Sequence, residues 1–184
     1  MPAESEYLVR RLEPSDAPSM FAAVKASLPE LVYWMPWCKE NYALQDAEAW
    51  IHFAHEAWSR RGEFPLGVFE VRTGTVVGGT GVNHINNAYR IGNIGYWVST
   101  PYVGRGVARF AAKQAALLGF GELGLTRLEI VALTHNFASQ RVAESLGATR
   151  ECQARNRLYF HGEPHDAFVY SLAPSDIASW SGAQ

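Results

Sequence analysis

The hydrophobic pattern of this chain changes its period at Gly104-Arg105-Gly106, and this change limits the folds open to it. Upstream, apolar and β-branched residues lie in short segments separated by turn residues, which is typical of an antiparallel meander. These segments are 66–71, 76–85 and 89–98. Downstream, apolar residues from Val107 to Leu118 recur at the spacing of one helix face. The sequence therefore predicts a strand that passes through two glycines into a helix.

The rest of the chain supplies further helices and strands around this point. Amphipathic patterns predict a helix after Pro14-Ser15-Asp16, one through 50–58 with Gly62 as its stop, and one through 138–146. Between the first two, residues 31–37 are a short aromatic segment broken by Pro29 and Pro36. Strands are predicted at 7–12, at 128–133 and in a final hairpin from about 155 to 172. We expect an α+β fold, with a mixed sheet and helices on its faces. The length fits a single domain over residues 7–173, followed by a C-terminal tail at 174–184.

Charge and apolar content exclude several classes of protein. Sixteen basic and eighteen acidic residues leave a formal net charge of −2, without the basic excess typical of a nucleic-acid binder. The pairs Arg10-Arg11 and Arg60-Arg61 are interpreted as solvated edges. No apolar run approaches the ~20 residues that span a bilayer. The acidic, polar N-terminus does not resemble a signal peptide. We expect a cytoplasmic protein whose two cysteines, Cys38 and Cys152, are free thiols.

The turn at Gly104-Arg105-Gly106 has the composition of an anion site. Glycines let backbone N–H groups converge on a phosphate, and the helix that begins near Val107 adds its positive dipole end. Arg105 can supply a charge-assisted hydrogen bond. A dinucleotide site of the Rossmann type would need a third glycine at Arg109 and an early βαβ unit, so that alternative is rejected. An ordinary strand-to-helix turn remains the structural alternative.

Several blocks in order resemble the GNAT superfamily of N-acetyltransferases, and within it the branch that acetylates ribosomal-protein N-termini. The resemblance covers roughly residues 7–173. The blocks that carry it are Arg10–Ala17, Tyr33–Trp37, Ile94–Val98, Tyr102–Ala108, Leu128–Ile130, Asn136–Ser139 and Val142–Ala148. It implies a GNAT fold, with a mostly antiparallel sheet, a splayed strand pair and flanking helices.

The same resemblance implies acetyl-CoA as co-substrate and no metal. The residues expected to bind it are Tyr96, Trp97, Val98, Val103, Gly104, Arg105, Gly106, Val107, Ala108, Asn136 and Ser139. Two positions depart from the family pattern. Pro101 stands where a Gln or Arg often precedes the phosphate loop, and Leu158 stands where some relatives carry a catalytic Glu. The backbone N–H groups of the glycine loop are unaffected by Pro101. The catalytic role of that Glu cannot be assigned to Leu158.

Asn136 and Ser139 have a structural and a chemical interpretation. Asn is a favoured N-cap, so the pair suits the first turn of the last helix. The resemblance adds that Asn136 contacts pantetheine and that Ser139 serves the leaving thiolate of CoA. Many relatives use a Tyr one turn later for the thiolate, but that position is Ala143.

The acceptor side is expected to include Tyr33, Trp34, Trp37, Asn83 and His84. The aromatic residues are either core or, as the resemblance implies, a wall of the acceptor cleft. His84 is the candidate protein base, although a surface histidine at a hairpin is the competing interpretation.

Other histidines are not interpreted as ligands. His161, His165 and Asp166 flank a polar turn, and His52 and His55 share a helix without a third ligand nearby, so no metal site is expected.

Three functions remain open on the sequence. The first is acetyl transfer to a protein or peptide N-terminal α-amine, because an α-amine with a pKa near 7.7–8.0 is partly neutral without a strong base. The second is acetylation of a small molecule such as an antibiotic, polyamine or amino acid. The third is a silent acyl-CoA sensor. The resemblance also allows a homodimer, whereas nucleic-acid and membrane partners are not expected.

Overall fold

The computed structural model describes residues 6–178 and 180, and the chain forms two compact units. The first unit takes the residues up to Gly81 together with Tyr96–Ala111. The second takes Val82–Gly95 and the residues from Ala112 onward. Strands β3 (Val76–Asn86) and β4 (Ile91–Val98) and helix α4 (Val107–Phe120) each contribute residues to both units. The expectation of a single domain over 7–173 with a separate tail stays a prediction.

Within the described residues, seven strands form one mostly antiparallel sheet in the order β1-β2-β3-β4-β5-β7-β6. The strands are β1 Tyr7–Arg10, β2 Phe64–Glu70, β3 Val76–Asn86, β4 Ile91–Val98, β5 Arg127–Leu133, β6 Thr149–Phe160 and β7 Glu163–Leu172. β4 and β5 are parallel and pair at Ile91–Asn93 with Arg127–Glu129, although β4 runs on for five more residues. The predicted α+β class with a mixed sheet is therefore confirmed.

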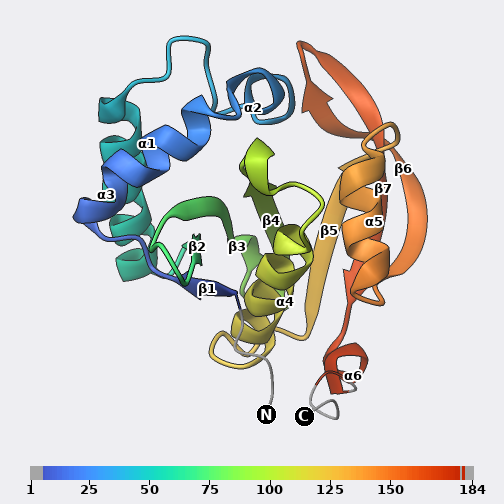
Figure 1. Ribbon diagram of the computed structural model, residues 1–184. Helices are drawn as coiled ribbons and strands as arrows, with labels where there is room; N and C mark the ends of the chain where they lie inside the picture. The colour runs from blue at the N-terminus through green and yellow to red at the C-terminus, as the bar shows by residue number, and fades with distance from the viewer. Residues whose placement is uncertain (1–5, 179, 181–184) are drawn as a thin grey trace. The chain divides into compact units, whose positions relative to one another are not determined.

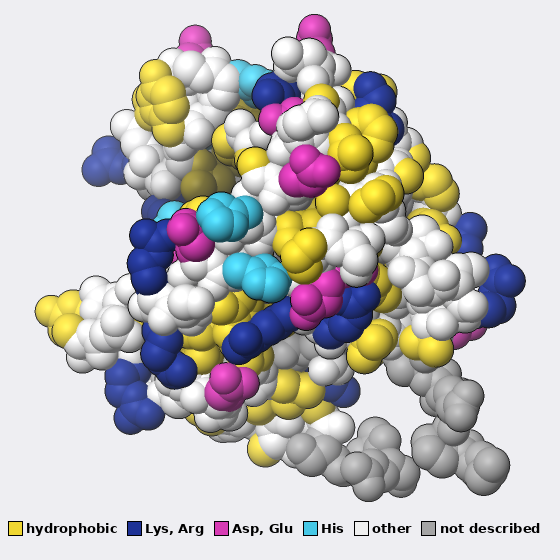
Figure 2. All heavy atoms as spheres, turned by 90° about the vertical axis from the view of Figure 1, so that its left-hand side faces the viewer, with side chains coloured by type: hydrophobic (Ala, Val, Ile, Leu, Met, Phe, Trp, Pro, Cys, Tyr) yellow, Lys and Arg dark blue, Asp and Glu magenta, His cyan; other side chains and the backbone are white. Residues whose placement is uncertain are grey.

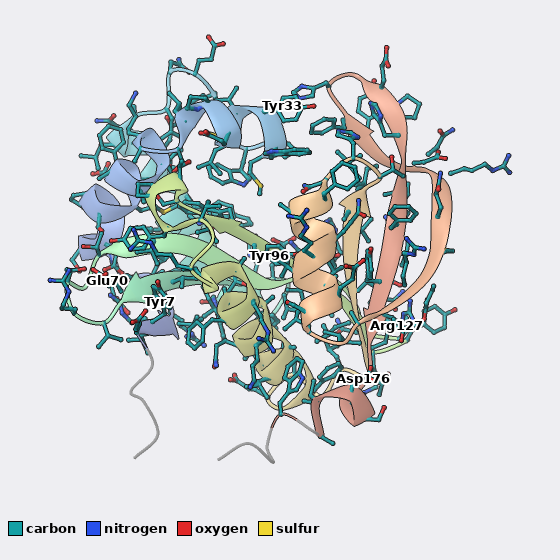
Figure 3. The ribbon with its side chains drawn as sticks, turned by 45° about the vertical axis from the view of Figure 1, so that its right-hand side comes forward. Tyr7, Tyr33, Glu70, Tyr96, Arg127 and Asp176 are labelled. Atoms are coloured by element: carbon teal, nitrogen blue, oxygen red, sulfur yellow. The ribbon has the colours of Figure 1, made fainter. Side chains whose placement is uncertain are left out.

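The first unit places three helices with the β1–β2 pair. They are α1 Ala17–Lys25, α2 Leu28–Trp34 and α3 Leu44–Arg60, and α1 and α3 lie side by side (Figure 1). β1 and β2 are antiparallel, and Tyr7 pairs with Glu70 at one end (Figure 3). The apolar stripes of α1 and α3 meet in one cluster that includes Met20, Val24 and Ile51. Burial of these stripes is what holds the helices in place.

Helix α3 begins and ends with recognisable caps. The Asp46 carboxylate accepts a hydrogen bond from the Ala43 backbone N–H at 2.8 Å and is paired with the Lys39 ammonium at 2.8 Å. The Lys39 hydrogen bond is the main reason why the pKa of Asp46 lies below its usual value. At the other end Arg61 is left-handed, with a φ of 53°, one residue before the Gly62 stop predicted from the sequence.

The second unit is built around β5 and β7. β7 pairs antiparallel with β5 along Leu128–Leu133 and with the long strand β6 on its other side. Helix α5, Phe137–Ser145, lies beside β5 (Figure 1). The apolar core of the unit includes Leu128, Ile130, Tyr170 and Leu172, all nearly fully buried.

A network of charges ties these strands together on the surface. The Arg127 guanidinium of β5 (labelled in Figure 3) forms two hydrogen bonds of 2.7 Å with the carboxylate of Glu151 on β6. Arg127 also contacts Glu129 at 2.9 Å, and the Ser171 hydroxyl of β7 donates to Glu151 at 2.7 Å. Hydrogen bonds from Arg127 and then Ser171 lower the pKa of Glu151 to about 2.

Two details of the sequence-based assignment were wrong. Residues 31–37, expected to be an irregular aromatic segment broken by prolines, begin inside helix α2, whose Pro29 lies in the first turn, where a missing N–H costs nothing. The last hairpin begins at Thr149, not at about 155, because bulges between Arg150 and Cys152 and between Ala154 and Leu158 disturb the alternation of β6.

No helix among the described residues is long and apolar enough to cross a membrane. The face that carries α1 and α3 exposes basic and acidic side chains together with apolar ones (Figure 2).

Candidate cofactor and acceptor sites

The loop between β4 and α4 has the geometry of a backbone anion cradle. β4 ends at Val98, a short 3-10 turn η2 follows at Thr100–Tyr102, and α4 begins at Val107. Gly104 and Gly106 have φ values of 81° and 78°, a left-handed region that glycine enters without strain. A Cβ added at either glycine meets no atom within 4 Å, so both backbones border open space. The loop can therefore admit a phosphate close to its amides.

The start of α4 is anchored to the first unit beneath this loop. Val107 and Ala111 are almost completely buried and pack with Val68 and Val77. The N–H of Phe110 donates to the carbonyl of Gly106 at 3.0 Å, which opens the helix at the second glycine. The N–H groups of a first helical turn have no carbonyl partner within the helix, so they are available to an anion.

Arg105, between the glycines, is exposed at the rim of the loop. Its guanidinium carbon lies 5.0 Å from the centre of the Tyr102 ring, a cation–π distance that limits the directions the side chain takes. A charged, partly oriented guanidinium beside two open glycine backbones suits a pyrophosphate.

Two buried serines fasten the strand end before the loop to the helices of the same unit. Ser27, between α1 and α2, is fully buried, and its hydroxyl lies 3.0 Å from the hydroxyl of Ser99. The Thr100 backbone N–H donates to Ser27 Oγ at 2.8 Å, and both serine hydroxyls contact the carbonyl of Ala23. Sequence reasoning missed this pair, because the two serines are 72 positions apart.

Trp97, predicted to bind the cofactor, lies flat on a glycine of β3. A Cβ added at Gly79 would come within 2.5 Å of the indole nitrogen of Trp97, so only glycine leaves room for this ring. The ring also contacts Trp37 from the α2–α3 loop, with centroids 5.9 Å apart. The structure thus brings a predicted cofactor residue and a predicted acceptor residue together.

The other two aromatic residues predicted for the acceptor side lie on α2. Tyr33 and Trp34 form an edge-to-face pair with centroids 4.7 Å apart, and Tyr33 is exposed. Like the loop and Trp37, they belong to the first unit.

In the second unit, Asn136 caps helix α5. Its side-chain oxygen accepts a hydrogen bond from the backbone N–H of Ser139 at 3.1 Å. The Ser139 residue takes part in this bond through its backbone N–H. Buried Gln140 holds the preceding loop, because its side-chain amide donates to the carbonyls of Leu133 and Thr134 at 3.1 and 3.0 Å. Sequence reasoning named Asn136 and Ser139 and missed Gln140.

Asn83 and His84 also lie in the second unit, near the end of β3. The Asn83 side-chain oxygen accepts a hydrogen bond from the Asn93 side chain of β4 at 2.9 Å. His84 is exposed and has a φ of 48°, an uncommon backbone conformation for a residue other than glycine. The geometry turns His84 outward at an irregular strand end, and its role as a base stays a prediction.

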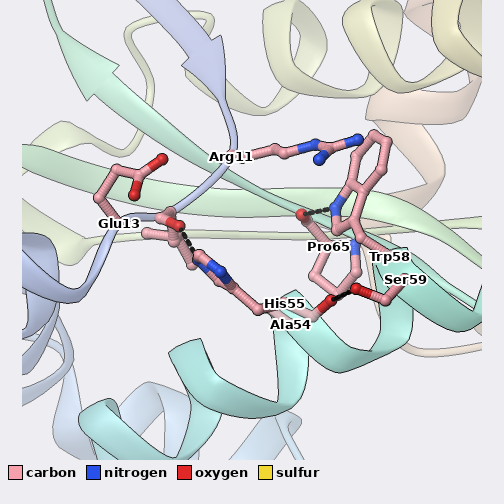
Figure 4. A pocket seen from close by; sticks show the side chains of 8 residues that line it. Arg11, Glu13, Ala54, His55, Trp58, Ser59 and Pro65 are labelled. Atoms are coloured by element: carbon pink, nitrogen blue, oxygen red, sulfur yellow. Dashed lines mark hydrogen bonds between the residues drawn. The ribbon is translucent and has the colours of Figure 1, made fainter.

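The arginine pairs have partners within the fold. Arg10 forms a two-pronged ion pair with Asp16 at 2.7 and 2.9 Å, and Arg60 pairs with Glu56 at 2.9 Å. Arg11 lies over the Trp58 indole at 3.6 Å and lines a surface pocket of about 160 Å³ (Figure 4). In that pocket the indole N–H of Trp58 donates to the Pro65 carbonyl at 2.8 Å. These contacts explain the basic pairs as structural.

Among the described residues, no group of three or more His, Cys, Asp or Glu side chains could hold a metal ion. His161 and His165 pack with Phe160 at ring distances of 4.1 and 5.8 Å, and His135 lies 6.3 Å from His165. The histidines at this hairpin are therefore part of an aromatic cluster.

The fold, the glycine loop and the capped helix α5 are those expected of an acyl-CoA-dependent transferase. The acetyltransferase (GNAT) domain family matches residues 7–149, and the chain belongs to this family. It is an acetyl-CoA-dependent N-acetyltransferase, which answers the choice between an enzyme and a silent sensor.

Three relatives illustrate the comparison. The chain is 28% identical to the "Putative ribosomal N-acetyltransferase YdaF" of Bacillus subtilis, over 95% of this chain and 93% of that protein. It is 31% identical to a solved "putative ribosomal-protein-serine acetyltransferase" from Vibrio cholerae, with a TM-score of 0.78 and coverage of 94% and 96%.

A second solved structure supports the fold alone. The Microcin C7 self immunity acetyltransferase MccE, solved with acetyl-CoA and AMP, is 19% identical, with a TM-score of 0.83 and coverage of 92% and 93%.

Proposed function

We propose that this enzyme transfers an acetyl group from acetyl-CoA to the N-terminal α-amine of a protein or peptide. The binding of acetyl-CoA is supported by the Gly104–Gly106 loop, whose two left-handed glycine backbones face open space at the start of α4. The choice of an N-terminal α-amine as acceptor is supported by two relatives that align over nearly the whole chain and are named as ribosomal acetyltransferases.

In this proposal, the backbone amides of Val103–Ala108 hold the pyrophosphate, and Arg105 adds a charge-assisted hydrogen bond. The backbone of Tyr96–Val98 pairs with the pantetheine arm, and the Asn136 side chain contacts its amide. These roles suit the residues, because the loop offers donors to an anion and a strand end offers donors and acceptors to an amide.

The reaction joins the acceptor nitrogen to the thioester carbonyl carbon and breaks the bond from that carbon to sulfur. A backbone N–H near Val98 stabilises the negative charge that develops on the carbonyl oxygen. The hydroxyl of Ser139 donates a hydrogen bond to the departing thiolate. The proton lost by the amine passes to solvent water or to His84. An α-amine suits this chemistry, because a useful fraction is neutral near pH 7.5 without a strong base.

The proposal includes no metal and places the enzyme in the cytoplasm. The thiols support the location, because Cys38 is buried and unpaired and Cys152 is exposed and unpaired. Free exposed thiols persist best in a reducing compartment.

The test is release of CoA thiol from acetyl-CoA with a panel of acceptors. The panel contains peptides with free N-termini, the same peptides with blocked N-termini and one internal lysine, and small amines such as spermidine. We expect turnover with free N-termini and little with blocked ones. Turnover restricted to lysine or to small amines would reject the proposed acceptor while leaving the acetyltransferase intact.

A further inference from the structure

Two serines at helix starts in the first unit do not cap their own helices. Ser27 is the N-cap residue of α2 and Ser99 is the N-cap residue of η2, and neither side chain bonds a backbone N–H of its own helix. Serine is favoured at an N-cap because its hydroxyl usually accepts a hydrogen bond from one of the free N–H groups of the first turn. Here both hydroxyls make their hydrogen bonds elsewhere.

The two hydroxyls form one buried group with the end of α1 and the start of η2. Ser27 Oγ and Ser99 Oγ lie 3.0 Å apart, and the carbonyl of Ala23 accepts from them at 2.9 and 3.1 Å. The Thr100 N–H donates to Ser27 Oγ at 2.8 Å. One hydroxyl proton serves the carbonyl and the other serves the contact between the serines. In either arrangement a lone pair of Ser27 Oγ is left for Thr100.

This bond satisfies the first amide of the 3-10 turn. The N–H groups of the two residues after Pro101 donate to the carbonyls of Ser99 and Thr100 at 2.8 and 3.2 Å, and Pro101 itself has no N–H. The Thr100 N–H points away from these bonds, as the first N–H groups of a helical turn do. Ser27 Oγ therefore supplies an acceptor that η2 does not offer to Thr100.

The position of η2 decides where the glycine loop begins. Tyr102 is the last residue of η2, and Gly104 follows two positions later. The Tyr102 ring packs on the buried cluster that contains Val107, and the Arg105 guanidinium carbon lies 5.0 Å from the centre of this ring. Because η2 is held at its first amide and at its last side chain, it presents the loop backbone and Arg105 in one arrangement.

We propose that Ser27 and Ser99 are positioning residues for acetyl-CoA, because their hydroxyls hold η2 in the conformation in which the glycine loop binds pyrophosphate. This inference rests on the proposed function, since it needs the loop as the phosphate site. Without the Ser27 hydroxyl, the Thr100 N–H loses its acceptor, and η2 shifts until this N–H meets water. Acetyl-CoA then binds only the fraction of molecules in the original arrangement, and its apparent Kd rises by the reciprocal of that fraction.

The experiment measures CoA binding by calorimetry and acetyl transfer by steady-state kinetics for Ser27→Ala. We expect the Kd for CoA and the KM for acetyl-CoA to rise about tenfold, as when about a tenth of the free enzyme has the binding conformation. The kcat at saturating acetyl-CoA and the KM for the acceptor should stay within about twofold of wild type, because bound co-substrate restores that conformation. A loss of folded enzyme alone would instead lower kcat and leave Kd unchanged.

Two further variants separate hydrogen bonding from packing. Ser27→Cys keeps a side chain of similar shape but offers only a weak acceptor, so it should bind CoA as weakly as Ser27→Ala. Ser99→Ala should raise the Kd for CoA only about two- to threefold, because Ser27 keeps its bonds to Ala23 and Thr100.

Ser19→Ala is the matched control. The Ser19 hydroxyl of α1 accepts the Val76 N–H at 2.8 Å, the same distance as in the bond from Thr100 to Ser27, but at the start of β3. Ser19→Ala and Ser27→Ala should both melt a few degrees lower, because each leaves a backbone N–H without its acceptor. Only Ser27→Ala should bind CoA more weakly.

Wild-type affinity for CoA in Ser27→Ala, affinity restored in Ser27→Cys, or an equal loss in Ser19→Ala would each overturn the positioning role. CoA binding needs no acceptor, so these outcomes do not depend on which amine is acetylated. If Gly106→Val binds CoA normally, the loop is not the phosphate site and both proposals fail. If Gly106→Val loses binding but Ser27→Ala does not, only the serine pair fails. Should melting curves show that Ser27→Ala does not fold, Ser99→Ala decides, and an unchanged Kd there overturns the inference.

Discussion

Single residues in this enzyme act through backbone conformation as much as through side chains. Gly104 and Gly106 are left-handed in the loop that we propose as the phosphate site. The Asn136 side chain accepts a hydrogen bond from the Ser139 backbone N–H and so caps α5. Substitutions at these positions can therefore separate conformational effects from binding and catalysis.

Gly106→Val is expected to abolish binding of CoA. The new side chain would occupy the open space beside the loop, and the φ of 78° would add strain for a β-branched residue. Gly74→Val is the matched control, because Gly74 has a φ of 69°, an unobstructed Cβ direction and a place in the β2–β3 turn, outside the loop. Both variants should melt a few degrees lower, but only Gly106→Val should lose calorimetric binding. Normal CoA binding by Gly106→Val would mean that the phosphate loop lies elsewhere.

Ser139→Ala is expected to lower kcat 10- to 100-fold, about 1.4–2.7 kcal/mol of barrier, with little change in KM for acetyl-CoA. Asn136 caps the helix through the Ser139 backbone N–H, which alanine retains, so this cap should survive the substitution, and melting curves check it. Asn136→Ala is the control for the cap and should cost about 1 kcal/mol of stability. If kcat is unchanged in Ser139→Ala, the thiolate is served by water or by another residue.

At the scale of elements, the sheet of the second unit depends on a surface link across its strands. β6 is an edge strand of the sheet, and most of its residues are exposed. Few apolar contacts are available to fix its register, and two bulges interrupt its pairing with β7. Hydrogen bonds from Arg127 and Ser171 to Glu151 join β5, β6 and β7. They fix the position of β6 where a buried apolar face would otherwise do so.

Glu151→Gln tests this link through its pH dependence. The pKa of Glu151 is about 2 in the folded state and near 4.5 without its partners, so its contribution is fully present above pH 4.5. It is lost as the pH falls from about 4.5 toward 2. The pair is largely exposed, so solvent screening keeps the effect below about 1 kcal/mol, or roughly 1–3 °C in Tm.

Melting curves of Glu151→Gln and wild type from pH 7 to pH 3 measure this effect. The difference in Tm should be largest near pH 7 and shrink in acid. Glu122→Gln, at an exposed position, is the control and should match the wild type throughout. A difference that grows on acidification would contradict the assignment.

At the scale of the whole molecule, acetyl-CoA is expected to stabilise the fold. A ligand at 100 times its Kd that binds only the folded state adds about 2.7 kcal/mol, which corresponds to roughly 5–11 °C in Tm for a chain of this size. Thermal melts with and without acetyl-CoA measure the shift, and Gly106→Val should show none. Identical wild-type melts, together with no heat of binding, would exclude the glycine loop as a CoA site.

The sequence by itself determined the features that depend on neighbours along the chain. The period change at Gly104–Gly106 located the loop and α4, and Asn136 predicted the cap of α5, because turns, caps and amphipathic faces are set within a few residues. The order of the blocks identified the family. The same local reasoning misread α2, where prolines looked like breaks although Pro29 is compatible with a first helical turn.

Only the tertiary structure decided which distant residues meet. The Trp37–Trp97 contact joins rings 60 positions apart, and the hydroxyls of Ser27 and Ser99 meet across 72. No periodicity encodes such pairs, because each depends on how whole helices and strands pack. The role of Gly79 is equally invisible in the sequence: its missing side chain matters because an indole from another strand fills that space. Local sequence set the turn between β4 and α4, and packing brought the rings of Trp37 and Trp97 together.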